Sequence, residues 1–320
     1  MNNNTLLSAV TISLMTLNEK FSLQNTDKMF SKVSSYQVKH WLDKQWDEQK
    51  KLEKYITTLN IDWTKGWLMI DDTIIEKKYA EKIECVYNLY SSKNKGFIRG
   101  ISLTVLLWTN GVKTIPITFM IYEKNENNKP KMTKNEFALN SVQYALGLGI
   151  RPIKVCFDSK FASNQLLNYL NDNNLIYFTQ LASNRTFNGI QLKMRHFQPY
   201  TEIGKLKGVR HKVSICKYRR RYYASNMTEN RVTSQFIVKE YRDRWKIEVL
   251  FRNLKQLCHL EECQCQRTIA QRHYVYCCIC ALMRLEKLNK GSVYKNKKYF
   301  QQKMIGFRIN GSRALRLFTA

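Results

Sequence analysis

The order of strand-like and helix-like segments between residues 63 and 290 limits the folds that are open to this chain. Three strand-like runs come first, and the last two are separated by Thr109-Asn110-Gly111. Asn-Gly between two such runs is a strong hairpin signal. A helix, a strand, a second helix, a strand, a β-rich stretch and a long helix follow. This order predicts an α/β fold in which helices lie on the faces of one mixed sheet.

Hydrophobic periodicity places the individual elements. Strands are expected at residues 67–70, 101–108, 112–122, 153–157 and 175–181, and helices at 35–59, 135–148, 161–170, 233–257 and 269–288. We therefore expect a helical N-terminal segment at 1–62, an α/β body at 63–290 with a β-rich insertion at about 185–228, and a basic C-terminal tail at 291–320.

The chain is strongly basic, which restricts its partners. It has 53 Lys and Arg against 25 Asp and Glu among 320 residues, a formal net charge of +28. The positive electrostatic potential of a chain with this net charge attracts a polyanion, either nucleic acid or an acidic membrane surface. An A- and T-rich genome would enrich lysine but would not explain the shortage of acids. No apolar run approaches the ~20 residues of a membrane span, and residues 6–17 make a poor signal peptide. The sequence favours a cytoplasmic, nucleic-acid-binding protein.

Cysteine is concentrated in one segment near the C-terminus. Two histidines, His259 and His273, lie in the same segment. The six clustered cysteines are Cys258, Cys263, Cys265, Cys277, Cys278 and Cys280. No pair has the two-residue gap of a zinc knuckle or ribbon, and the last three lie in an apolar helical stretch. Reduced, mostly buried thiols are the favoured interpretation, and a metal site in this segment stays open.

Two aspartates directly follow buried strand-like runs. Asp71 comes after Trp67–Ile70, and Asp158 comes after Ile153–Phe157. Taken singly, either acid could simply end a strand or cap a turn. Phosphodiester chemistry, however, uses two Mg²⁺ ions ~3.5–4 Å apart, one on the nucleophile and one on the leaving oxygen. Because Mg²⁺ requires oxygen ligands, converging carboxylates on neighbouring strands and a crossing helix would suit such a site.

The long helix predicted at residues 233–257 carries the sharper pattern. Counted at 100° per residue, one face presents an acid among three cations and a phenol, within about 80° of arc around the acid. These residues are Tyr241, Arg244, Glu248, Arg252 and Lys255. A solvated helix with intrahelical ion pairs, such as Arg244 with Glu248, is the alternative. Cations aligned beside one carboxylate favour a groove that holds phosphates next to a metal site.

This face also carries a family resemblance. The run Tyr241-x2-Arg244-x3-Glu248-x6-Lys255 resembles, without a gap, the YREK signature of bacterial insertion-sequence transposases of the IS-four family. The surrounding sequence, YRDRWKIEVLFRNLKQ, is similar to the sequences of that family throughout. IDDT at 70–73 resembles its first-Asp motif, Asp-x-Thr after a strand, and VCFDSKF at 155–161 resembles its second. The resemblance covers about residues 65–290.

The resemblance implies a ribonuclease-H-like catalytic core with three catalytic, metal-binding acids. Asp71, Asp158 and Glu248 would hold two Mg²⁺ or Mn²⁺ ions, and Asp71 is preferred to Asp72 because it keeps the Asp-x-Thr spacing. The DNA-binding residues would contact phosphates of the transposon end. They are Tyr241, Arg244 and Lys255, together with Arg252 on the same helix face.

The same resemblance implies a function. The chain would be a DNA transposase that cleaves transposon ends and transfers the strands into target DNA. Its partner would be double-stranded DNA, both the terminal inverted repeats and the target DNA. A homodimer would bind this DNA, and the protein would be cytoplasmic and associated with the nucleoid. Residues 1–62 would be the DNA-binding segment and 63–290 the catalytic domain. Two alternatives remain: a truncated or inactive DNA-binding descendant, and a metal nuclease without joining activity.

Overall fold

The computed structural model describes residues 3–91, 94–125, 127–198, 200–229 and 232–305. Contacts divide the chain into two compact units. Unit 1 is built from Met1–Thr58, Thr73–Leu103 and Val249–Ala320, and unit 2 from Leu59–Asp72 and Thr104–Glu248. Three elements contribute residues to both units: β1 (Trp67–Glu76), β3 (Gly96–Thr109) and α8 (Trp245–Leu257).

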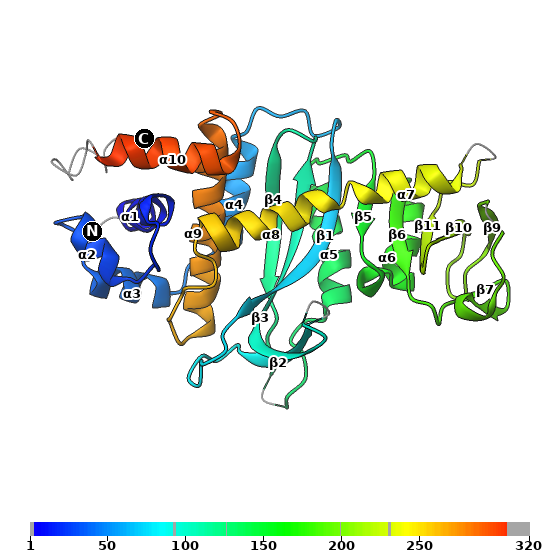
Figure 1. The fold of residues 1–320 in the computed structure, drawn as a ribbon, viewed down its shortest axis with the longest axis horizontal. Helices are drawn as coiled ribbons and strands as arrows, with labels where there is room; N and C mark the ends of the chain where they lie inside the picture. Colours follow the sequence, from blue (N-terminus) through cyan, green and yellow to red (C-terminus); the bar gives the residue numbers. More distant parts are fainter. Residues whose placement is uncertain (1–2, 92–93, 126, 199, 230–231, 306–320) are drawn as a thin grey trace. The chain divides into compact units, whose positions relative to one another are not determined.

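Unit 2 contains a mixed β-sheet, drawn as arrows in Figure 1. Its strands lie in the order β3-β1-β5-β6-β11-β10-β9, and β4 pairs with β3. β1, β5 and β6 are parallel, whereas β6, β11, β10 and β9 are antiparallel neighbours. The further bounds are β4 (Thr114–Ile121), β5 (Val155–Phe157), β6 (Tyr177–Leu181), β9 (Glu202–Lys205), β10 (Lys212–Tyr218) and β11 (Arg221–Ser225). β7 (Thr186–Phe187) and β8 (Ile190–Gln191) form a separate hairpin. The mixed α/β fold predicted from the sequence is confirmed.

Helices cover both faces of this sheet because its central strands are apolar on both sides. On one face, the Cys156 sulfur lies 3.6 Å from the carbonyl of Glu240 in α7 (Ser234–Arg242), and the Phe178 ring lies 5.9 Å from Phe236. On the other face lie α5 (Lys134–Gly147), η1 (Ser159–Phe161) and α6 (Asn164–Asp172), and α5 packs on β4, η1 and α6. All three residues of β5 are fully buried between these layers.

The predicted Asn-Gly hairpin joins β3 and β4. Gly111 has φ +89°, in the left-handed region that glycine tolerates without steric cost. The Asn110 side chain accepts hydrogen bonds from the backbone N–H groups of Val112 and Lys113, at 3.1 and 2.8 Å. The turn is therefore formed by local interactions, and this prediction is confirmed.

The first buried strand is longer than the sequence suggested. We expected it at residues 67–70, with Asp71 directly after it, but β1 continues to Glu76. The continuation is rich in β-branched residues, which favour strands, and the N–H of Lys77 donates to the carbonyl of Arg99 on β3 at 2.9 Å. Asp71 consequently lies inside a strand, where successive side chains point to opposite faces.

The helix predicted at residues 233–257 is two helices, α7 and α8. The chain turns between them at Asp243 and Arg244, where the N–H of Arg244 donates to the carbonyl of Tyr241 at 3.0 Å. That bond spans three residues instead of four and tightens the helix locally. The prediction of one continuous helix was wrong at this point.

A buried lysine explains the break. Lys154, just before β5, donates to the carboxylates of Glu240 and Asp243, both at 2.6 Å, and approaches the Glu240 carbonyl at 3.4 Å. In an uninterrupted helix that carbonyl would accept the N–H of Arg244. Burial lowers the pKa of Lys154, but the two carboxylates outweigh it and raise the pKa overall.

Unit 1 is mainly helical and is organised around α9 (Thr268–Lys287), against which four other helices pack (Figure 1). Those four are α1 (Asn3–Thr16), α3 (Ser35–Asp43), α4 (Glu48–Thr57) and α10 (Val293–Ile305), while α2 (Gln24–Met29) packs on α1 and α3. β2 (Tyr87–Ser91) pairs antiparallel with β3. α10 lies in the segment predicted as a basic tail, and residues 306–320 of that tail lie outside the described residues.

The helix predicted at residues 35–59 is also divided, into α3 and α4. Asp47 lies at the N-terminus of α4, and its carboxylate accepts a hydrogen bond from the backbone N–H of Lys50 at 2.9 Å. The Trp46 ring stacks on the ring of His273 with centroids 3.6 Å apart. An N-cap and a buried aromatic contact therefore end one helix and start the next.

Glu48 joins α4 to α9 through an ion pair in which its own side chain is buried and that of Arg272 is partly exposed. Its carboxylate accepts from Arg272 at 2.8 and 2.6 Å, and the second oxygen lies 3.6 Å from the Nε2 of His273. Burial opposes ionisation of this carboxyl, but His273 and Arg272 outweigh burial and lower its pKa from 4.5 to about 2. The ionised carboxylate is thus stabilised in the folded state.

Replacing Glu48 with Gln is expected to lower the free energy of unfolding by about 3 kcal/mol at neutral pH. Because the folded-state pKa is depressed, this stabilisation is complete above pH 4.5 and is lost as the pH falls through about 2. The gap between wild type and Glu48→Gln in urea unfolding should therefore narrow between pH 7 and pH 3. The exposed Glu19→Gln serves as control and should match the wild type. A gap that stays constant with pH would contradict the assignment.

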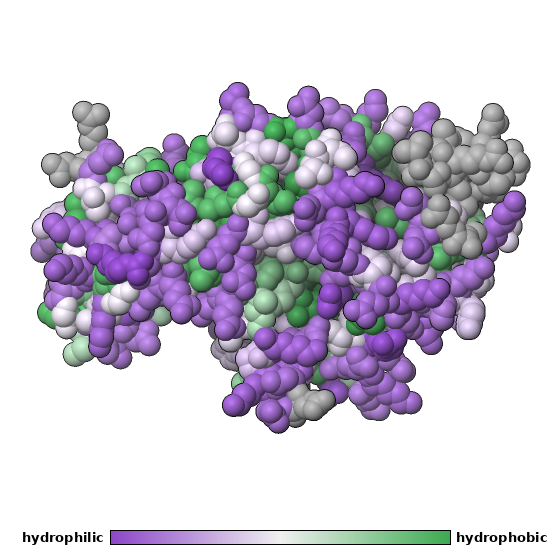
Figure 2. Space-filling view, turned by 180° about the vertical axis from the view of Figure 1, so that it is seen from behind, coloured by the Kyte–Doolittle hydropathy of each residue, from purple (hydrophilic) through white to green (hydrophobic). Residues whose placement is uncertain are grey.

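The surface reflects the composition of the chain. On the face drawn in Figure 2, hydrophilic residues cover most of the surface and hydrophobic residues show only in patches. Among the helices described, none is long and apolar enough to cross a membrane. The nine cysteines are free thiols, and eight of them are buried, with Cys280 half-buried.

Candidate active site

Asp71 is a buried carboxylate in the middle of β1. It points to the sheet face that carries α7, where it accepts a hydrogen bond from Arg244, and its other oxygen accepts the N–H of Asp72 at 2.9 Å. Burial raises its pKa from 3.8 to about 6, and the guanidinium of Arg244 opposes this shift only in part. A cation placed beside such a carboxylate stabilises its ionised form.

Arg244 is the centre of the cluster. Its guanidinium donates to Asp71 and to Glu248, and its Nε donates to the hydroxyl of Tyr241 at 3.0 Å. The turn between α7 and α8 allows this reach, because it brings Arg244 to the sheet face while Glu248 follows one turn later. Burial would lower the pKa of Arg244, but Asp71 and the other nearby groups raise it, so the side chain is a permanent cation.

Asp158 directly follows β5, the strand that neighbours β1. Ile70 pairs with Phe157 in the parallel register of β1 and β5, so Asp71 and Asp158 occupy the next positions along each strand. Asp158 caps η1, and its carboxylate accepts the N–H of Ser159 at 2.7 Å. The charge of Asp158 is one of those that raise the pKa of Arg244 against the effect of burial. Two of the three predicted acids, Asp71 and Glu248, thus pair with Arg244, and Asp158 follows the strand next to the one that carries Asp71.

Asp72 points to the opposite face of the sheet. There it forms ion pairs with Lys134, the first residue of α5, and Lys160, in η1. Burial would raise the pKa of Asp72, but Lys160 and Lys134 hold it below its usual value. Asp72 is therefore neutralised by two lysines on one face, while Asp71 meets Arg244 on the other.

Sequence reasoning missed both of these lysines. Lys160 had a weak signal, since it lies two residues after Asp158 within the VCFDSKF motif. Lys134 had none, because it is 62 residues from Asp72 in the chain and begins a helix of its own. Lys160 ties Asp72 on β1 to the turn that carries Asp158, and Lys134 ties it to α5.

Two of the predicted DNA-binding cations belong to unit 1. Lys255 in α8 donates to the carbonyl of Ile74 at 2.5 Å and pairs with the carboxylate of Glu261 at 2.9 Å. Arg252, on the same helix, is exposed. Lys255 thus already has protein partners, and its predicted contact with phosphate stays a prediction.

The site offers oxygen ligands of the kind that Mg²⁺ prefers. Asp71 and Glu248 are close enough to share the charge of one guanidinium. Within the described part of the chain, however, no group of three or more His, Cys, Asp or Glu side chains is arranged to hold a metal ion. The guanidinium of Arg244 lies between two of the three acids and supplies the positive charge there.

The chain has a mixed sheet in which Asp71 and Asp158 follow paired residues of two parallel strands, and Glu248 lies on a later helix. This arrangement is typical of the ribonuclease-H-like class of nucleic-acid enzymes. Residues 62–284, more than half of the chain, match the family model described as "Transposase DDE domain". The chain belongs to this family and is a DDE transposase. No curated protein matches the chain.

Membership of the transposase DDE family implies several general properties. Members of the family are polynucleotidyl transferases that act on DNA, and they generally use divalent metal ions. The basic composition of the chain agrees with a DNA partner.

Proposed function

We propose that this transposase cleaves DNA at the ends of its mobile element and joins the freed strands to target DNA. We further propose that it is of the IS-four type with the YREK signature. One observation supports the proposal above all others: the Arg244 side chain is held by Asp71, Glu248 and Tyr241, and Asp158 follows the parallel strand next to Asp71. These are the acids and the phosphate-binding residues that the sequence motifs predict.

Asp71, Asp158 and Glu248 would hold two Mg²⁺ or Mn²⁺ ions. When bound, the ions would activate the attacking oxygen and neutralise the leaving oxygen. The buried position of Asp71 supports this role, because its raised pKa reflects a carboxylate that lacks full compensation by the protein. Asp158 and Glu248 are only half-buried, so they remain open to solvent and substrate.

Arg244 would exchange its carboxylate partners for phosphate oxygens when DNA binds. Its planar guanidinium matches phosphate geometry with paired hydrogen bonds. Tyr241 would keep it oriented, since the phenol accepts the Nε–H group and leaves both Nη groups free to redirect. Arg252 and Lys255 would add further contacts along α8.

The remaining assignments follow from the same proposal. Residues 1–62 would bind DNA, residues 63–290 would form the catalytic domain, and residues 291–320 would form a basic tail. The substrate would be double-stranded DNA with terminal inverted repeats, held by a homodimer in a synaptic complex associated with the nucleoid.

The proposal is tested by cleavage of DNA that carries the element's own inverted repeats. We expect Mg²⁺- or Mn²⁺-dependent cuts at the repeat ends, joined products with a target plasmid, and no reaction with scrambled ends or with EDTA. Specific end binding without cleavage in either metal would indicate a DNA-binding descendant. Cleavage that never yields joined products would indicate a nuclease. Either result would overturn the proposal.

A further inference from the structure

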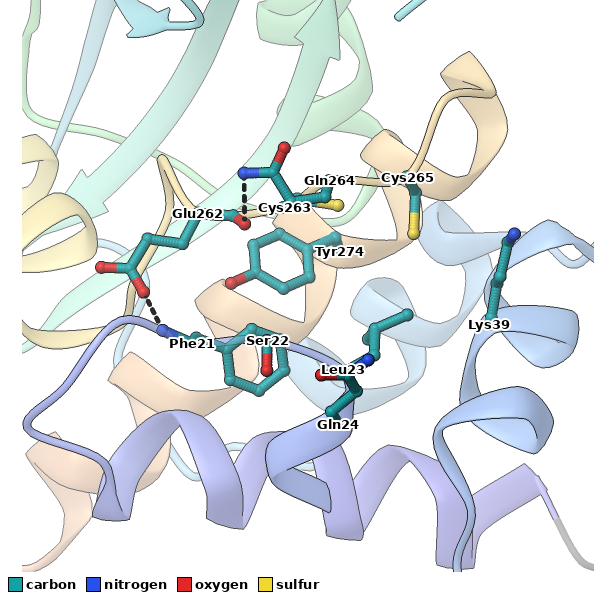
Figure 3. Close-up of a pocket in the computed structure, with 10 residues that line it drawn as sticks. All are labelled: Phe21, Ser22, Leu23, Gln24, Lys39, Glu262, Cys263, Gln264, Cys265 and Tyr274. Carbon is teal, nitrogen blue, oxygen red and sulfur yellow. Dashed lines mark hydrogen bonds between the residues drawn. The ribbon is translucent and has the colours of Figure 1, made fainter. Parts of the chain in front are cut away.

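A pocket of about 340 Å³ opens in unit 1, but its charges do not suit a polyanion (Figure 3). Its lining holds one cation, Lys39, and one acid, Glu262, whose carboxylate accepts the backbone N–H of Phe21. Cations gather more densely on unit 2, at the turn between β10 and β11. Four of the five residues 217–221 are basic, and all five are exposed. A polyanion would therefore find more positive charge at this turn than in the pocket.

The conformation of the turn does not explain its arginines. Tyr218 pairs with Arg221 in the antiparallel register, so Arg219 and Arg220 are the two turn residues. Arg219 has φ +55°, in the left-handed region that is unfavourable for a residue with a Cβ atom. Two-residue hairpin turns favour glycine or asparagine at such positions. Arginine at position 219 thus opposes the local backbone preference, which is expected where a side chain serves a function.

Tyr218 joins the turn to the end of α7, which packs on β10 and β11 (Figure 1). The centroid of its ring lies 5.6 Å from the guanidinium carbon of Arg219 and 5.7 Å from that of Arg242, the last residue of α7. The ammonium of Lys217 lies 5.7 Å from the ring of Tyr222. An aromatic face attracts a cation without neutralising its charge. The turn and the end of α7 therefore bring five cations together.

The protein leaves these five cations without acidic partners. None of them forms an ion pair with a carboxylate among the residues that the structure describes. The acids that flank Arg242 in the chain, Glu240 and Asp243, both pair with Lys154 at 2.6 Å. Because like charges that are close together repel, an anion with several charges would stabilise the group. The five cations form the basic cluster, which comprises Lys217, Arg219, Arg220, Arg221 and Arg242.

The basic cluster adjoins the candidate active site within unit 2. Arg242 comes two residues before Arg244 in the chain. Two residues after Arg221 on β11, the ring of Tyr223 lies 5.2 Å from the ring of Tyr241. The hydroxyl of Tyr241 in turn accepts the Nε–H of Arg244 at 3.0 Å. A DNA backbone bound at Arg244 can therefore also reach the basic cluster.

We propose that the basic cluster is a second phosphate-binding site, which holds the backbone of double-stranded DNA beside the part bound at Arg244. The proposal rests on the proposed function, because it takes DNA at Arg244 as its starting point. Guanidinium and ammonium groups bind phosphate oxygens, so these contacts position the duplex and carry no base sequence. The backbone belongs to the transposon end or to the target DNA, and both present the same phosphate chemistry.

The test is the affinity of the full chain for duplex DNA in EDTA, measured by fluorescence anisotropy. Arg219→Gln with Arg220→Gln removes two phosphate contacts, and affinity should fall on the order of tenfold for each. The log–log slope of affinity against salt between about 50 and 200 mM should become shallower by about 1.8, at about 0.9 per contact. Arg219→Lys with Arg220→Lys keeps the charges and should retain most of the slope.

A matched control removes the same number of charges elsewhere on unit 2. Lys113 and Lys129 are exposed and lie in the loops on either side of β4. β4 pairs with β3, which β1, β5 and β6 separate from β11 and β10 in the strand order. Lys113→Gln with Lys129→Gln should therefore bind DNA as the wild type does.

Arg219→Gly separates binding from folding. It should lower the affinity for DNA but not the melting temperature, because glycine adopts φ +55° without steric cost. Two duplexes of equal length identify the DNA. Loss of affinity only for the duplex that carries the inverted repeats assigns the cluster to the transposon end, and loss for an unrelated duplex as well assigns it to target DNA.

The proposal is overturned if the double Gln variant binds both duplexes with the wild-type affinity and salt slope. It is also overturned if the control variant loses as much affinity, since any surface charge would then serve. These measurements need no divalent metal and no reaction. Failure of the wild-type chain to cleave or join DNA would contradict the proposed function and leave the binding result intact.

Discussion

Asp71→Asn is expected to abolish metal-dependent cleavage of transposon ends. The substitution keeps the shape of the side chain but removes the anionic oxygen that would hold a metal ion. Loss of a metal ligand is worth several kcal/mol of transition-state stabilisation, a drop in rate on the order of 10³-fold or more. Single-turnover cleavage of labelled end DNA in Mg²⁺ and in Mn²⁺ measures the effect, and end binding by gel shift should remain measurable.

Asp72→Asn is the matched control, because it changes the adjacent residue by the same atoms. Asp72 points to the opposite face and pairs with Lys134 and Lys160. We expect this variant to be less stable, because two lysines lose their partner, but to cleave within about tenfold of the wild-type rate, a change of roughly 1.4 kcal/mol. The reverse pattern, an inactive Asp72→Asn with an active Asp71→Asn, would move the metal ligand by one residue.

Arg244→Gln is expected to affect both DNA binding and stability. Loss of a charge-assisted phosphate contact costs about 1.5–3 kcal/mol, which is roughly tenfold or more in affinity for cut ends. The same change leaves the buried carboxylate of Asp71 without its cation, which should lower the free energy of unfolding by about 3 kcal/mol or more. Gel-shift titration and urea unfolding measure the two effects separately.

A double variant separates the two roles of Arg244. In Asp71→Asn with Arg244→Gln, no unpaired buried charge remains, so much of the lost stability should return while end affinity stays low. Arg252→Gln, on an exposed position of α8, serves as the control for a general loss of charge. If Arg244→Gln lowers stability but binds cut ends as the wild type does, Arg244 is a structural ion-pair residue and not a phosphate ligand.

Local sequence signals determined much of this fold. The hairpin between β3 and β4 was predictable because Asn110 and Gly111 form the turn with their immediate neighbours. The parallel strands were visible as apolar runs, and the family resemblance rested on motifs a few residues long. The choice of Asp71 over Asp72 also began as a spacing argument, and the opposite faces of the two side chains support it.

Tertiary contacts decided the rest, because they join residues that no local pattern relates. No glycine or proline marks the break between α7 and α8 in the sequence. The break follows from Lys154, which lies 86 residues before Glu240 and donates to its carbonyl. The placement of Arg244 between Asp71 and Glu248 depends on that break. The pairing of Lys134 with Asp72 likewise arises only when α5 packs on the sheet. Periodicity records which side chains are buried, whereas the partner that each buried charge finds depends on how distant segments meet.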